Sequence, residues 1–535
     1  MSVKFLGRTG LFHRLVGYET IQWSTFEQAV GDRIVYVSSS TGVDSGSFDA
    51  THGSITNPFA SINYARNSLR DGYADWLLLK KGDTFSGANN RDLVWTLDGR
   101  STTQKMVVGS YGTGARPKID TGTEMFCGLG ATHDITHLAF VGLEIYPGSR
   151  TSSADGDPAG FGWTGGTIDI LWEDMYVHGY HMGLNLQGYP EDSPTVWWHS
   201  NLVMRGCVIK ENFGTTPGAS NPSGLFVGRV DGLLIDFCTF DHNGYIADTN
   251  YNWFRHNVYL QTGTTGMTIK NSLLVGTDGI QMREGGTISN NVFSRLQVGA
   301  ILAGEDSAAS GVVTYCNDNV FLEGRDPPAT GDPPNNQGGE AIKLQNLIGG
   351  SIQRNIISKG TGTAAIGIKL YAVGGRACEN VNISNNIISD WGGPAIEINN
   401  SITAYSNNIL ANNVFQNPNN TQGDAVVVAP TGLSSIDFSS SSNIFSSNGT
   451  DLEVIVNGTP TALTTWLASI GDTGSVDSPV TYTGANYTLG TYYQSIGGSN
   501  DHDAFMAVVD AQNKDNWNPA LTAPAVASYI RIGFA

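Results

Sequence analysis

The chain has 535 residues, of which 40% are hydrophobic and 14% are charged, so its composition is that of a globular protein and excludes a disordered one. Its 67 glycines follow no Gly-X-Y period, which excludes a collagen-like fold and indicates many tight turns. The formal net charge of −19 argues against nucleic acid and anionic membranes as partners, because both attract basic surfaces.

The five cysteines lack the paired spacings of a disulfide framework and the C-x-x-C pattern of a zinc site. We expect small buried side chains at Cys127, Cys207, Cys238, Cys316 and Cys378. No apolar run approaches the roughly 18 residues of a transmembrane helix, so we expect no membrane insertion. The first residues lack a signal-peptide pattern, which indicates either an authentic N-terminus or one left after cleavage.

The first expected elements are an N-terminal extension over residues 1–33 and then a strand and a capping helix within residues 34–75. The strand is the tetrapeptide IVYV that begins at Ile34. After Asn57, the residues Phe59, Ile62 and Leu69 share one side of an amphipathic helix. We expect this helix to close the N-terminal end of a repetitive body, because stacked repeats need covered ends.

Between residues 76 and 450, two short patterns alternate. The first is a small, an aliphatic, a variable and an apolar residue, and it begins at Gly183, Gly224, Asn257, Gly279, Ala300, Ala341, Gly367 and Ala395. The second is an asparagine followed by two apolar residues, at steps of 27 to 36 residues, and it begins at Asn291, Asn319, Asn355, Asn386, Asn413 and Asn443. Very short strands at such a period are typical of stacked coils that share one core.

Two other repetitive folds do not fit these patterns. A doubly wound sheet would need helical segments between the strands, and a β-propeller would need antiparallel hairpins. Asparagine suits a recurring corner because it tolerates the left-handed conformation and because its amide can bond the copies above and below. We therefore predict an all-β parallel β-helix over residues 76–450.

The last part of the chain, residues 451–535, is predicted to contain C-terminal strands and capping helices. Residues 450–500 are rich in Thr, Ser and Gly and are interpreted as loosely repeating strands. Short helices are expected at Asp503–Asp510 and at Pro519–Ile530.

The coils resemble those of the pectin-lyase-like superfamily of right-handed parallel β-helices, over roughly residues 33 to 450. The segment VYVSSSTG from Val35 and the segment NPFASI from Asn57 are similar to the first strand and capping helix of many such proteins. The resemblance implies a right-handed coil and an extracellular protein, either secreted or virion-associated. The superfamily holds polysaccharide lyases, glycoside hydrolases, uronan epimerases and phage tailspike depolymerases, so it indicates a carbohydrate-active protein without naming the reaction.

Side chains alternate between the two sides of a strand, so the repeats can be aligned to find the outward positions. One outward column is then Asn185, Phe226, Tyr259, Gln281, Leu302, Lys343, Lys369 and Glu397. The next is Gln187, Gly228, Gln261, Arg283, Gly304, Gln345, Tyr371 and Asn399. Tyr, Gln, Arg and Lys can stack on sugar rings and donate hydrogen bonds, so we predict that this face binds a polysaccharide.

The candidate catalytic residues are His256, Tyr259 and Arg283, because the largest number of potentially reactive side chains is expected around them. Gln261 and Arg283 are separated by one coil of 22 residues, and so are Tyr259 and Gln281. A base candidate, a cation and hydrogen-bond donors would then share one patch. The other candidate substrate-binding residues are Gln187, Trp197, Trp198, His242, Gln261, Gln281, Glu284, Lys343, Gln345, Lys369 and Tyr371.

The segment Gly279–Phe293 also resembles a stretch of chondroitinase B and related alginate lyases, in which an outward arginine precedes a glycine and an Asn-Asn turn. Arg283 matches that arginine. The lysine that the family has one coil earlier is replaced by Gln261 or Thr262, and its acidic calcium ligands are not evident. The resemblance implies β-elimination next to a uronate. No cofactor is required by this interpretation, and calcium is a candidate ligand because of Asp155 and Asp157.

Three insertions are expected to wall the binding face. They are Gly188–His199 with Trp197 and Trp198 as candidate sugar platforms, Tyr245–Trp253, and the Pro-rich segment Gly324–Gly339.

Four functions remain open at this point. The first is a polysaccharide lyase, in which Arg283 neutralises the uronate while His256 or Tyr259 moves protons. The second is a glycoside hydrolase, which needs two carboxylates from among Asp236, Asp241, Asp248, Glu284 and Glu397. A phage tailspike would be a homotrimer where the enzymes are expected to be monomeric, and a non-catalytic binding protein would lack activity altogether.

Overall fold

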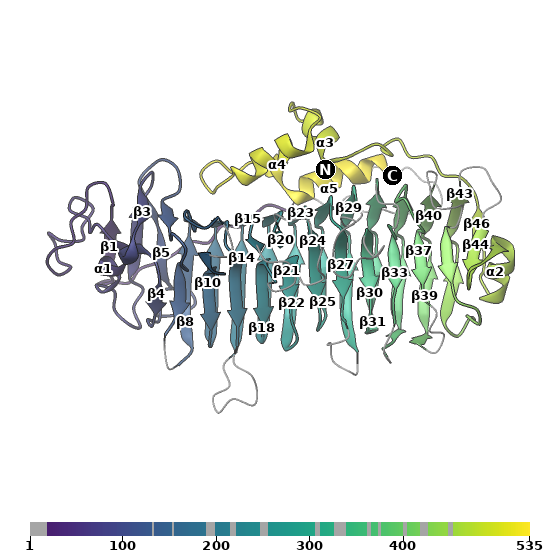
Figure 1. The fold of residues 1–535 in the computed structure, drawn as a ribbon, viewed down its shortest axis with the longest axis horizontal. Helices are drawn as coiled ribbons and strands as arrows, with labels where there is room; N and C mark the ends of the chain where they lie inside the picture. Colours follow the sequence, from purple (N-terminus) through teal and green to yellow (C-terminus); the bar gives the residue numbers. More distant parts are fainter. Residues whose placement is uncertain are drawn as a thin grey trace.

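Three long parallel sheets run along the molecule and define its fold (Figure 1). The computed structural model describes residues 19–130, 133–151, 155–188, 198–214, 221–246, 255–304, 311–325, 339–360, 365–372, 376–399, 404–417, 426–447 and 453–535. We number the sheets in the order in which each coil of the chain visits them. The coil of β22, β23 and β24, for example, passes through sheet 1, sheet 2 and sheet 3.

Sheet 1 consists, in spatial order, of β1 (Ile34–Val37), β2 (Trp76–Lys80), β5 (Met106–Tyr111), β8 (Ile135–Val141), β11 (Thr167–Glu173), β14 (His199–Arg205), β18 (Val230–Asp236), β22 (Thr264–Lys270), β25 (Gly286–Ser289), β28 (Val312–Asn317), β31 (Leu347–Gln353), β35 (Val381–Ser384), β39 (Asn408–Ala411) and β42 (Phe438–Ser441). Two short strands join it at one side, β34 (Cys378–Glu379) and β38 (Tyr405–Ser406).

Sheet 2 consists of β3 (Thr84–Ser86), β6 (Lys118–Asp120), β9 (Glu144–Tyr146), β12 (Tyr176–His178), β15 (Val208–Lys210), β19 (Thr239–Asp241), β23 (Leu273–Val275), β26 (Val292–Ser294), β29 (Val320–Leu322), β32 (Ile356–Ser358), β36 (Ile387–Ser389), β40 (Val414–Asn417), β43 (Ile444–Ser447) and β46 (Val476–Asp477).

Sheet 3 consists of β4 (Leu93–Trp95), β7 (Cys127–Leu129), β10 (Ala159–Thr164), β13 (Met182–Gln187), β17 (Ser223–Gly228), β21 (His256–Leu260), β24 (Asp278–Met282), β27 (Val298–Leu302), β30 (Glu340–Leu344), β33 (Ile368–Leu370), β37 (Ile396–Ile398), β41 (Val427–Ala429), β44 (Glu453–Val456) and β45 (Thr459–Ala462). A separate pair is formed by β16 (Phe213–Gly214) and β20 (Tyr245–Ile246).

The strand pairing confirms the predicted right-handed parallel β-helix. Among the described strands, every pairing is parallel except that of the terminal hairpin β44–β45. The core is the inside of the tube, where apolar side chains from the three sheets stack on one another. Phe293 and Phe321, for example, stack from neighbouring coils with ring centroids 4.4 Å apart. The five cysteines are buried and unbridged, as predicted.

Asparagines form a continuous ladder at the corner between sheets 1 and 2. Each amide Nδ2 donates to the Oδ1 of the next asparagine at 3.0 to 3.2 Å, and all six side chains are completely buried, from Asn291 through Asn319, Asn355, Asn386 and Asn413 to Asn443. The expectation that the ladder asparagine itself takes the left-handed conformation is wrong. That conformation belongs to the preceding residue, such as Asp318 at φ 60° and Arg354 at φ 54°. The ladder asparagine therefore points inward while its neighbour makes the turn.

Two short helices cover the ends of the tube. At the N-terminal end, α1 (Ile62–Arg66) buries Ile62 and Ala65, and it begins after Ser61, not directly after Asn57 as the sequence suggested. At the other end, α2 (Leu463–Ser469) buries Leu463 and Trp466 against the core. Residues 450–500 contain this helix and the hairpin β44–β45, so the interpretation of that stretch as strands alone is wrong.

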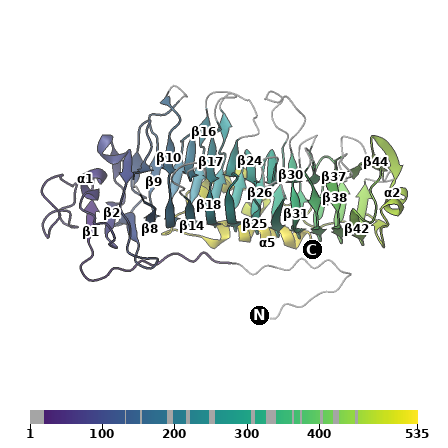
Figure 2. The ribbon, with the colours of Figure 1, turned by 90° about the horizontal axis from the view of Figure 1, so that it is seen from below.

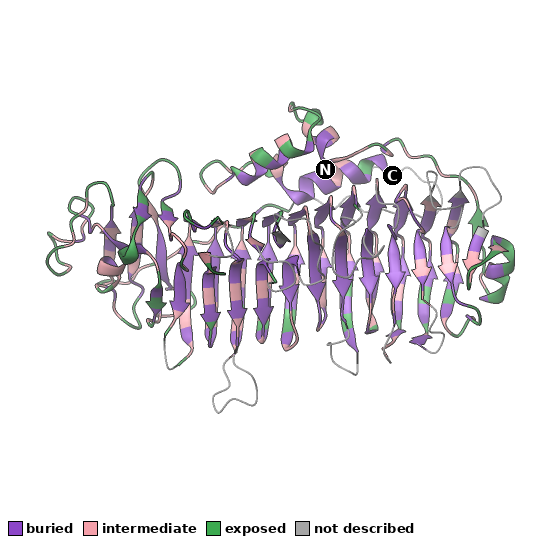
Figure 3. Ribbon diagram, in the orientation of Figure 1, coloured by how far each residue is buried: buried purple, intermediate pink, exposed green. Residues whose placement is uncertain are grey.

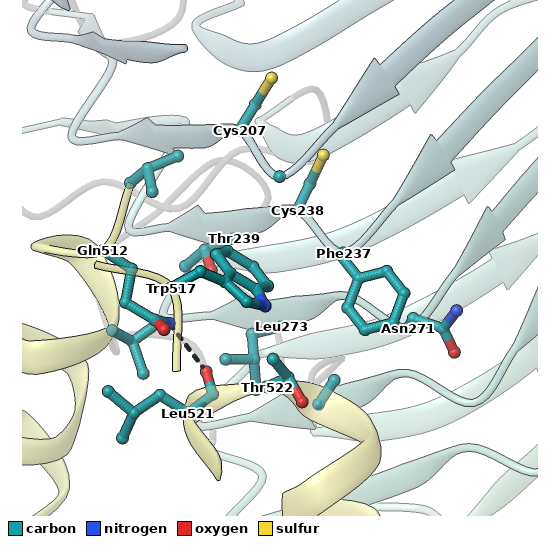
Figure 4. A pocket seen from close by; sticks show the side chains of 14 residues that line it. Cys207, Phe237, Cys238, Thr239, Asn271, Leu273, Gln512, Trp517, Leu521 and Thr522 are labelled. Carbon is teal, nitrogen blue, oxygen red and sulfur yellow. Dashed lines mark hydrogen bonds between the residues drawn. The ribbon is translucent and has the colours of Figure 1, made fainter. Parts of the chain in front are cut away.

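The C-terminal arm, which we define as residues 478–535, lies along sheet 2 (Figure 1). It contains α3 (Leu489–Ser495), α4 (His502–Asp510), the 3-10 turn η4 (Pro519–Leu521) and α5 (Ala523–Gly533). The two predicted helices are present, but they do not cap the end of the tube. They cover the apolar outward residues of sheet 2, namely Leu273, Val275, Val292, Val320, Leu322, Ile356, Ile387 and Val414. A small cavity remains beside Trp517, where the arm meets the corner between sheets 1 and 2 (Figure 4).

The N-terminal strap, which we define as residues 19–33, follows the outward side of sheet 1 without helix or strand (Figure 2). Phe26 packs on Val107, Ala139 and Leu171. The strap and the arm also touch, because the indoles of Trp23 and Trp517 meet edge to face at 5.3 Å. Figure 3 shows that the strands of the tube are mostly buried. Within the described residues, no helix has the length and apolar character needed to cross a membrane.

Candidate functional site

The longest connections of the coil lead into and out of sheet 3. Sheet 1 passes to sheet 2 through only two residues in most coils, as between Lys270 and Leu273. In contrast, seventeen residues separate Leu322 of β29 from Glu340 of β30. Insertions on one side of a repeat generally mark its functional face. Most of each predicted insertion, including Trp197, lies outside the described residues, and Trp198 is half-buried where the chain approaches β14.

The outward columns of sheet 3 follow the predicted alignment, with one correction. Tyr259 pairs with Gln281, and Lys343 pairs with Lys369, which pairs with Glu397.

At β27, Ile301 stands where Leu302 was expected, whereas Gly304 lies beside Arg283 and Gln345 as predicted. The small residue that begins the pattern is Gly299 and not Ala300. Because the residues after Gly299 are all apolar, the sequence fits the pattern in either register. Leu302 therefore lies in the core.

Tyr259, Arg283 and His256 form one contact group, which we call the tyrosine cluster. The Nε atom of Arg283 donates to the Tyr259 hydroxyl at 2.8 Å. The imidazole of His256 is stacked on the Tyr259 ring, with centroids 5.3 Å apart and planes inclined by 9°. The structure thus brings together the three residues that were predicted to be catalytic. His256 is completely buried, whereas Tyr259 and Arg283 keep 8% and 7% of their surface exposed.

Asp278 belongs to the same cluster and was missed in the sequence. It pairs with His256 in the parallel register, and its Oδ2 lies 3.8 Å from His256 Nδ1. The separation of 22 residues equals that between Tyr259 and Gln281, so the same step along the sequence would have found it. Burial lowers the pKa of the neighbouring Arg255 to about 10, while the charge of Asp278 acts in the opposite direction.

Lys343, Lys369 and Tyr371 form a second group with two carboxylates, which we call the lysine cluster. Lys343 Nζ lies 4.7 Å and Lys369 Nζ lies 5.3 Å from the centre of the Tyr371 ring. Lys369 also contacts Glu340 at 3.3 Å and Glu397 at 3.4 Å. Glu340 was not predicted, because it stands at the start of its strand and outside the aligned columns.

The two lysines respond in opposite ways to similar surroundings. Burial lowers the pKa of Lys343, and the carboxylates near it do not compensate. Burial acts in the same direction on Lys369, but Glu340 and Glu397 outweigh it and raise the pKa of that ammonium group. The direct contacts of Lys369 with both carboxylates explain the difference.

Gly304 lies next to Arg283 of the tyrosine cluster. A Cβ atom at this glycine would lie 2.8 Å from Arg283 Nη1, 3.3 Å from Gln281 Nε2 and 3.3 Å from Gln345 Oε1. Arg283, Gln281 and Gln345 therefore converge on Gly304. The outward face from β21 to β37 is thus mostly polar, with the apolar Ile301 of β27 between Gln281 and Lys343.

The other predicted site residues lie around or away from this surface. Gln187 stands two coils before Tyr259 and donates to Asn185 Oδ1 at 2.7 Å. Gln261 and Glu284 are half-buried next to the tyrosine cluster.

His242 is different, because it lies at the end of sheet 2, where its Nδ1 pairs with Asp241 Oδ1 at 2.5 Å. Asp241 raises the pKa of His242. It therefore follows a strand of sheet 2 and does not stand in the outward columns of sheet 3.

No protein-family profile and no curated protein sequence matches the chain. Solved structures with a similar arrangement include a mannuronic acid specific family 6 polysaccharide lyase from human gut microbiota, with 14% identity, a TM-score of 0.41, and coverage of 86% of this chain and 94% of that one. They also include tailspike protein 3 of bacteriophage CBA120, with 11% identity, a TM-score of 0.46, and coverage of 76% and 57%. A third is a GH136 lacto-N-biosidase from Eubacterium ramulus, with 14% identity, a TM-score of 0.38, and coverage of 83% and 67%.

At these identities the likeness concerns the fold alone. The sheet topology establishes that fold independently: the chain is a parallel β-helix built from three long sheets.

Proposed function

We propose that the chain is an enzyme that cleaves a long, uronate-containing polysaccharide by β-elimination on the outward face of sheet 3. The observation that carries the proposal is the 2.8 Å hydrogen bond from Arg283 to the Tyr259 hydroxyl. This bond joins the Tyr259 hydroxyl, which can accept and donate a proton, to the cationic side chain of Arg283. The same face of sheet 3 also carries the lysine cluster. An extracellular location, secreted or virion-associated, belongs to the same proposal.

β-Elimination beside a uronate requires a neutralised carboxylate, a base for the C5 proton and an acid for the leaving oxygen. In this mechanism Arg283 faces the uronate carboxylate and stabilises negative charge on the Tyr259 oxygen. Tyr259 takes up the C5 proton and returns it to the departing glycosidic oxygen. His256 is buried beneath Tyr259, so it would act through the tyrosine and not by touching the substrate.

The rest of the polysaccharide would follow the face of sheet 3 toward the lysine cluster. Gln281, Gln345 and Tyr371 offer amide groups and an aromatic ring along this path, and Lys343 and Lys369 offer positive charge. Calcium remains a candidate ligand. Within the described residues, no group of three or more His, Cys, Asp or Glu side chains is arranged to hold a metal ion.

The test is a panel of acidic and neutral polysaccharides, followed by ultraviolet absorbance of unsaturated uronate ends and by a reducing-end assay. We expect both signals to rise together. Tyr259→Phe should lower kcat/KM by about 100-fold or more, because it removes the proton-moving oxygen. The matched control is Tyr315→Phe, which removes the same hydroxyl from a tyrosine that is 46% exposed on sheet 1 and should leave activity unchanged.

A glycoside hydrolase is the second candidate, and the lysine cluster favours it. Glu340 and Glu397 contact the same ammonium nitrogen. Their oxygens are therefore separated by no more than about 7 Å, a bound that admits the separation of about 5 to 5.5 Å used by retaining enzymes. Reducing ends without absorbance, abolished by Glu397→Gln and retained in Tyr259→Phe, would establish this alternative.

The absence of a signal in both assays across the panel would contradict both enzymatic proposals. It would favour a polysaccharide-binding protein without catalysis. A trimer in solution, measured by sedimentation or light scattering, would support a tailspike, whereas we expect a monomer for a free enzyme. Retention of the protein on immobilised polysaccharide would separate binding from complete inactivity.

A further inference from the structure

We infer that Asp278 and His256 form a buried positioning pair that holds the Tyr259 hydroxyl in place. The catalytic consequence of this pair rests on the proposed function, but its effect on Tyr259 does not. Neither Asp278 nor the pairing was among the predicted site residues.

The first argument is the register of the strands. Asp278 of β24 pairs with His256 of β21, so the carboxylate stands one coil beyond the imidazole. The Nδ1 and Oδ2 atoms are 3.8 Å apart, and the two side chains are 0% and 1% exposed. A carboxylate beside a buried imidazole favours a proton on the facing nitrogen and fixes the orientation of the ring.

The second argument is the contact between the two rings. The planes of His256 and Tyr259 are inclined by only 9°, with centroids 5.3 Å apart, so the imidazole fixes the plane in which the phenol lies. Phe226 adds a contact from the preceding coil, with centroids 5.2 Å apart. The hydroxyl is thereby directed to Arg283 Nε at 2.8 Å.

The third argument is that the fold does not require these polar residues. One coil beyond Asp278, the corresponding position is Val298, which is 1% exposed and pairs in the same register. The stack therefore tolerates an apolar side chain at this place. Burying a carboxylate and an imidazole is costly unless they interact, so their presence together indicates a role beyond packing.

Other charged groups contact Tyr259 or respond to Asp278. Arg283 of β24 contacts the hydroxyl directly, and the pKa of Arg255, just before β21, responds to Asp278. On β30, the pKa of Lys343 is affected by both Asp278 and Glu340. Asp278→Asn would release the imidazole, so the phenol ring stacked on it would no longer hold its hydroxyl at Arg283 Nε. The ionisation midpoint of Tyr259 should therefore rise.

The deciding experiment needs no substrate. Carbon-13 labelling at the tyrosine Cζ follows ionisation by NMR, and Tyr259→Phe identifies the Tyr259 signal. We expect Asp278→Asn and His256→Gln to shift its midpoint upward by a similar amount. We expect the double variant to add little to either, because the two residues act as one unit. An unchanged midpoint in Asp278→Asn would overturn the inference whatever the enzyme does.

The control is His199→Asn, which alters another completely buried histidine, on sheet 1. It should lower the Tm by a comparable amount and leave the Tyr259 midpoint unchanged. A midpoint shift in this variant as well would show a general structural effect and would also contradict the inference.

If the chain cleaves a polysaccharide, Asp278→Asn should lower kcat by up to about 100-fold and change KM less than twofold, because misplacing a reacting group costs rate more than binding. Equal losses in kcat and in binding would contradict positioning. Inactivity of the wild-type protein on every polysaccharide would end the proposed function, while the NMR titration would still decide on the pair.

Discussion

The outward faces of sheets 2 and 3 are built on the same coils but carry different side chains. On sheet 2, outward residues such as Val292 and Val320 are apolar, and the C-terminal arm covers them. On sheet 3, outward residues such as Gln281, Lys343 and Lys369 are polar or charged and form the candidate site. The inward residues and the asparagine ladder build the tube in both cases. The outward positions are therefore free to specify either a packing surface or chemistry.

The largest effect is expected on the sheet 2 side. Phe505 of α4 is completely buried and contacts the rings of Tyr492 and Tyr493. Phe505→Ala should lower the free energy of unfolding of the arm by about 3 to 5 kcal/mol, through lost burial and the cavity left behind. Chemical denaturation and hydrogen exchange in the arm measure this loss.

The control for this change is Ile532→Ala, whose side chain is 59% exposed and should matter by less than about 0.5 kcal/mol. Polysaccharide cleavage by Phe505→Ala should remain normal at temperatures where the tube is folded. A loss of cleavage there would show that the two faces are not independent.

A smaller effect is expected for the buried cation of sheet 3. Lys369→Met leaves Glu340, which is 1% exposed, without its ammonium partner. The loss should be about 2 to 3 kcal/mol, because removing one member of a buried pair leaves the other charge uncompensated. Urea unfolding measures this loss.

Lys118→Met on sheet 2 is the matched comparison, since Lys118 is 46% exposed and pairs with Glu144. Its cost should not exceed about 1 kcal/mol. Equal losses at the two lysines would contradict the distinction between a buried and a surface pair.

The attachment of the arm should also depend on pH through Asp510. Burial and the neighbouring Asp241 raise the pKa of Asp510 to about 7, although Lys210 contacts it at 2.7 Å. A raised folded pKa means that protonation favours the folded state. This stabilisation is complete below the ordinary value of 3.8 and is lost as the pH rises through about 7.

The measurement is the stability of the arm between pH 4 and 8, in wild type and in Asp510→Asn. The variant should remove this part of the dependence, and the remaining pH effect of His242 should persist. Identical pH profiles for the two proteins would contradict the assignment to Asp510.

The smallest change in stability is expected at Tyr371. Tyr371→Leu removes the ring beneath Lys343 and Lys369 and should cost no more than about 1 kcal/mol. Retention on the polysaccharide in affinity electrophoresis should nevertheless fall several-fold. Unchanged retention would place the bound chain away from the lysine cluster.

The fold was predictable because its signals repeat. Each asparagine with two apolar residues marks the same corner, and the register follows from aligning them. The shift at β27 arose where Gly299 is followed by Ala300, because two small residues in a row leave the start of the strand ambiguous. The arm could not be placed from sequence, because its helices are as amphipathic as an end cap would be, and only the row of apolar residues on sheet 2 shows where they pack.

The candidate site was predictable to the extent that it lies in the outward columns. Tyr259 and Arg283 were found from the step of one coil and do meet. Asp278 and Glu340 stand at strand starts, where the alternation of sides no longer tells inward from outward. Both are almost completely buried. They belong to the site because of contacts with residues of other coils, and these contacts cannot be read from the sequence.

The N-terminal strap has a mechanical consequence. Glu19 contacts Lys270 at 3.2 Å and accepts from Asn271 at 2.8 Å, in the middle of the tube, although the first strand of the coil lies at its end. A force applied on the N-terminal side of Glu19 would therefore first load these contacts and the Trp23–Trp517 pair. The strap must detach before the force reaches the first coil. Its contacts therefore protect the N-terminal end of the tube against unfolding under force.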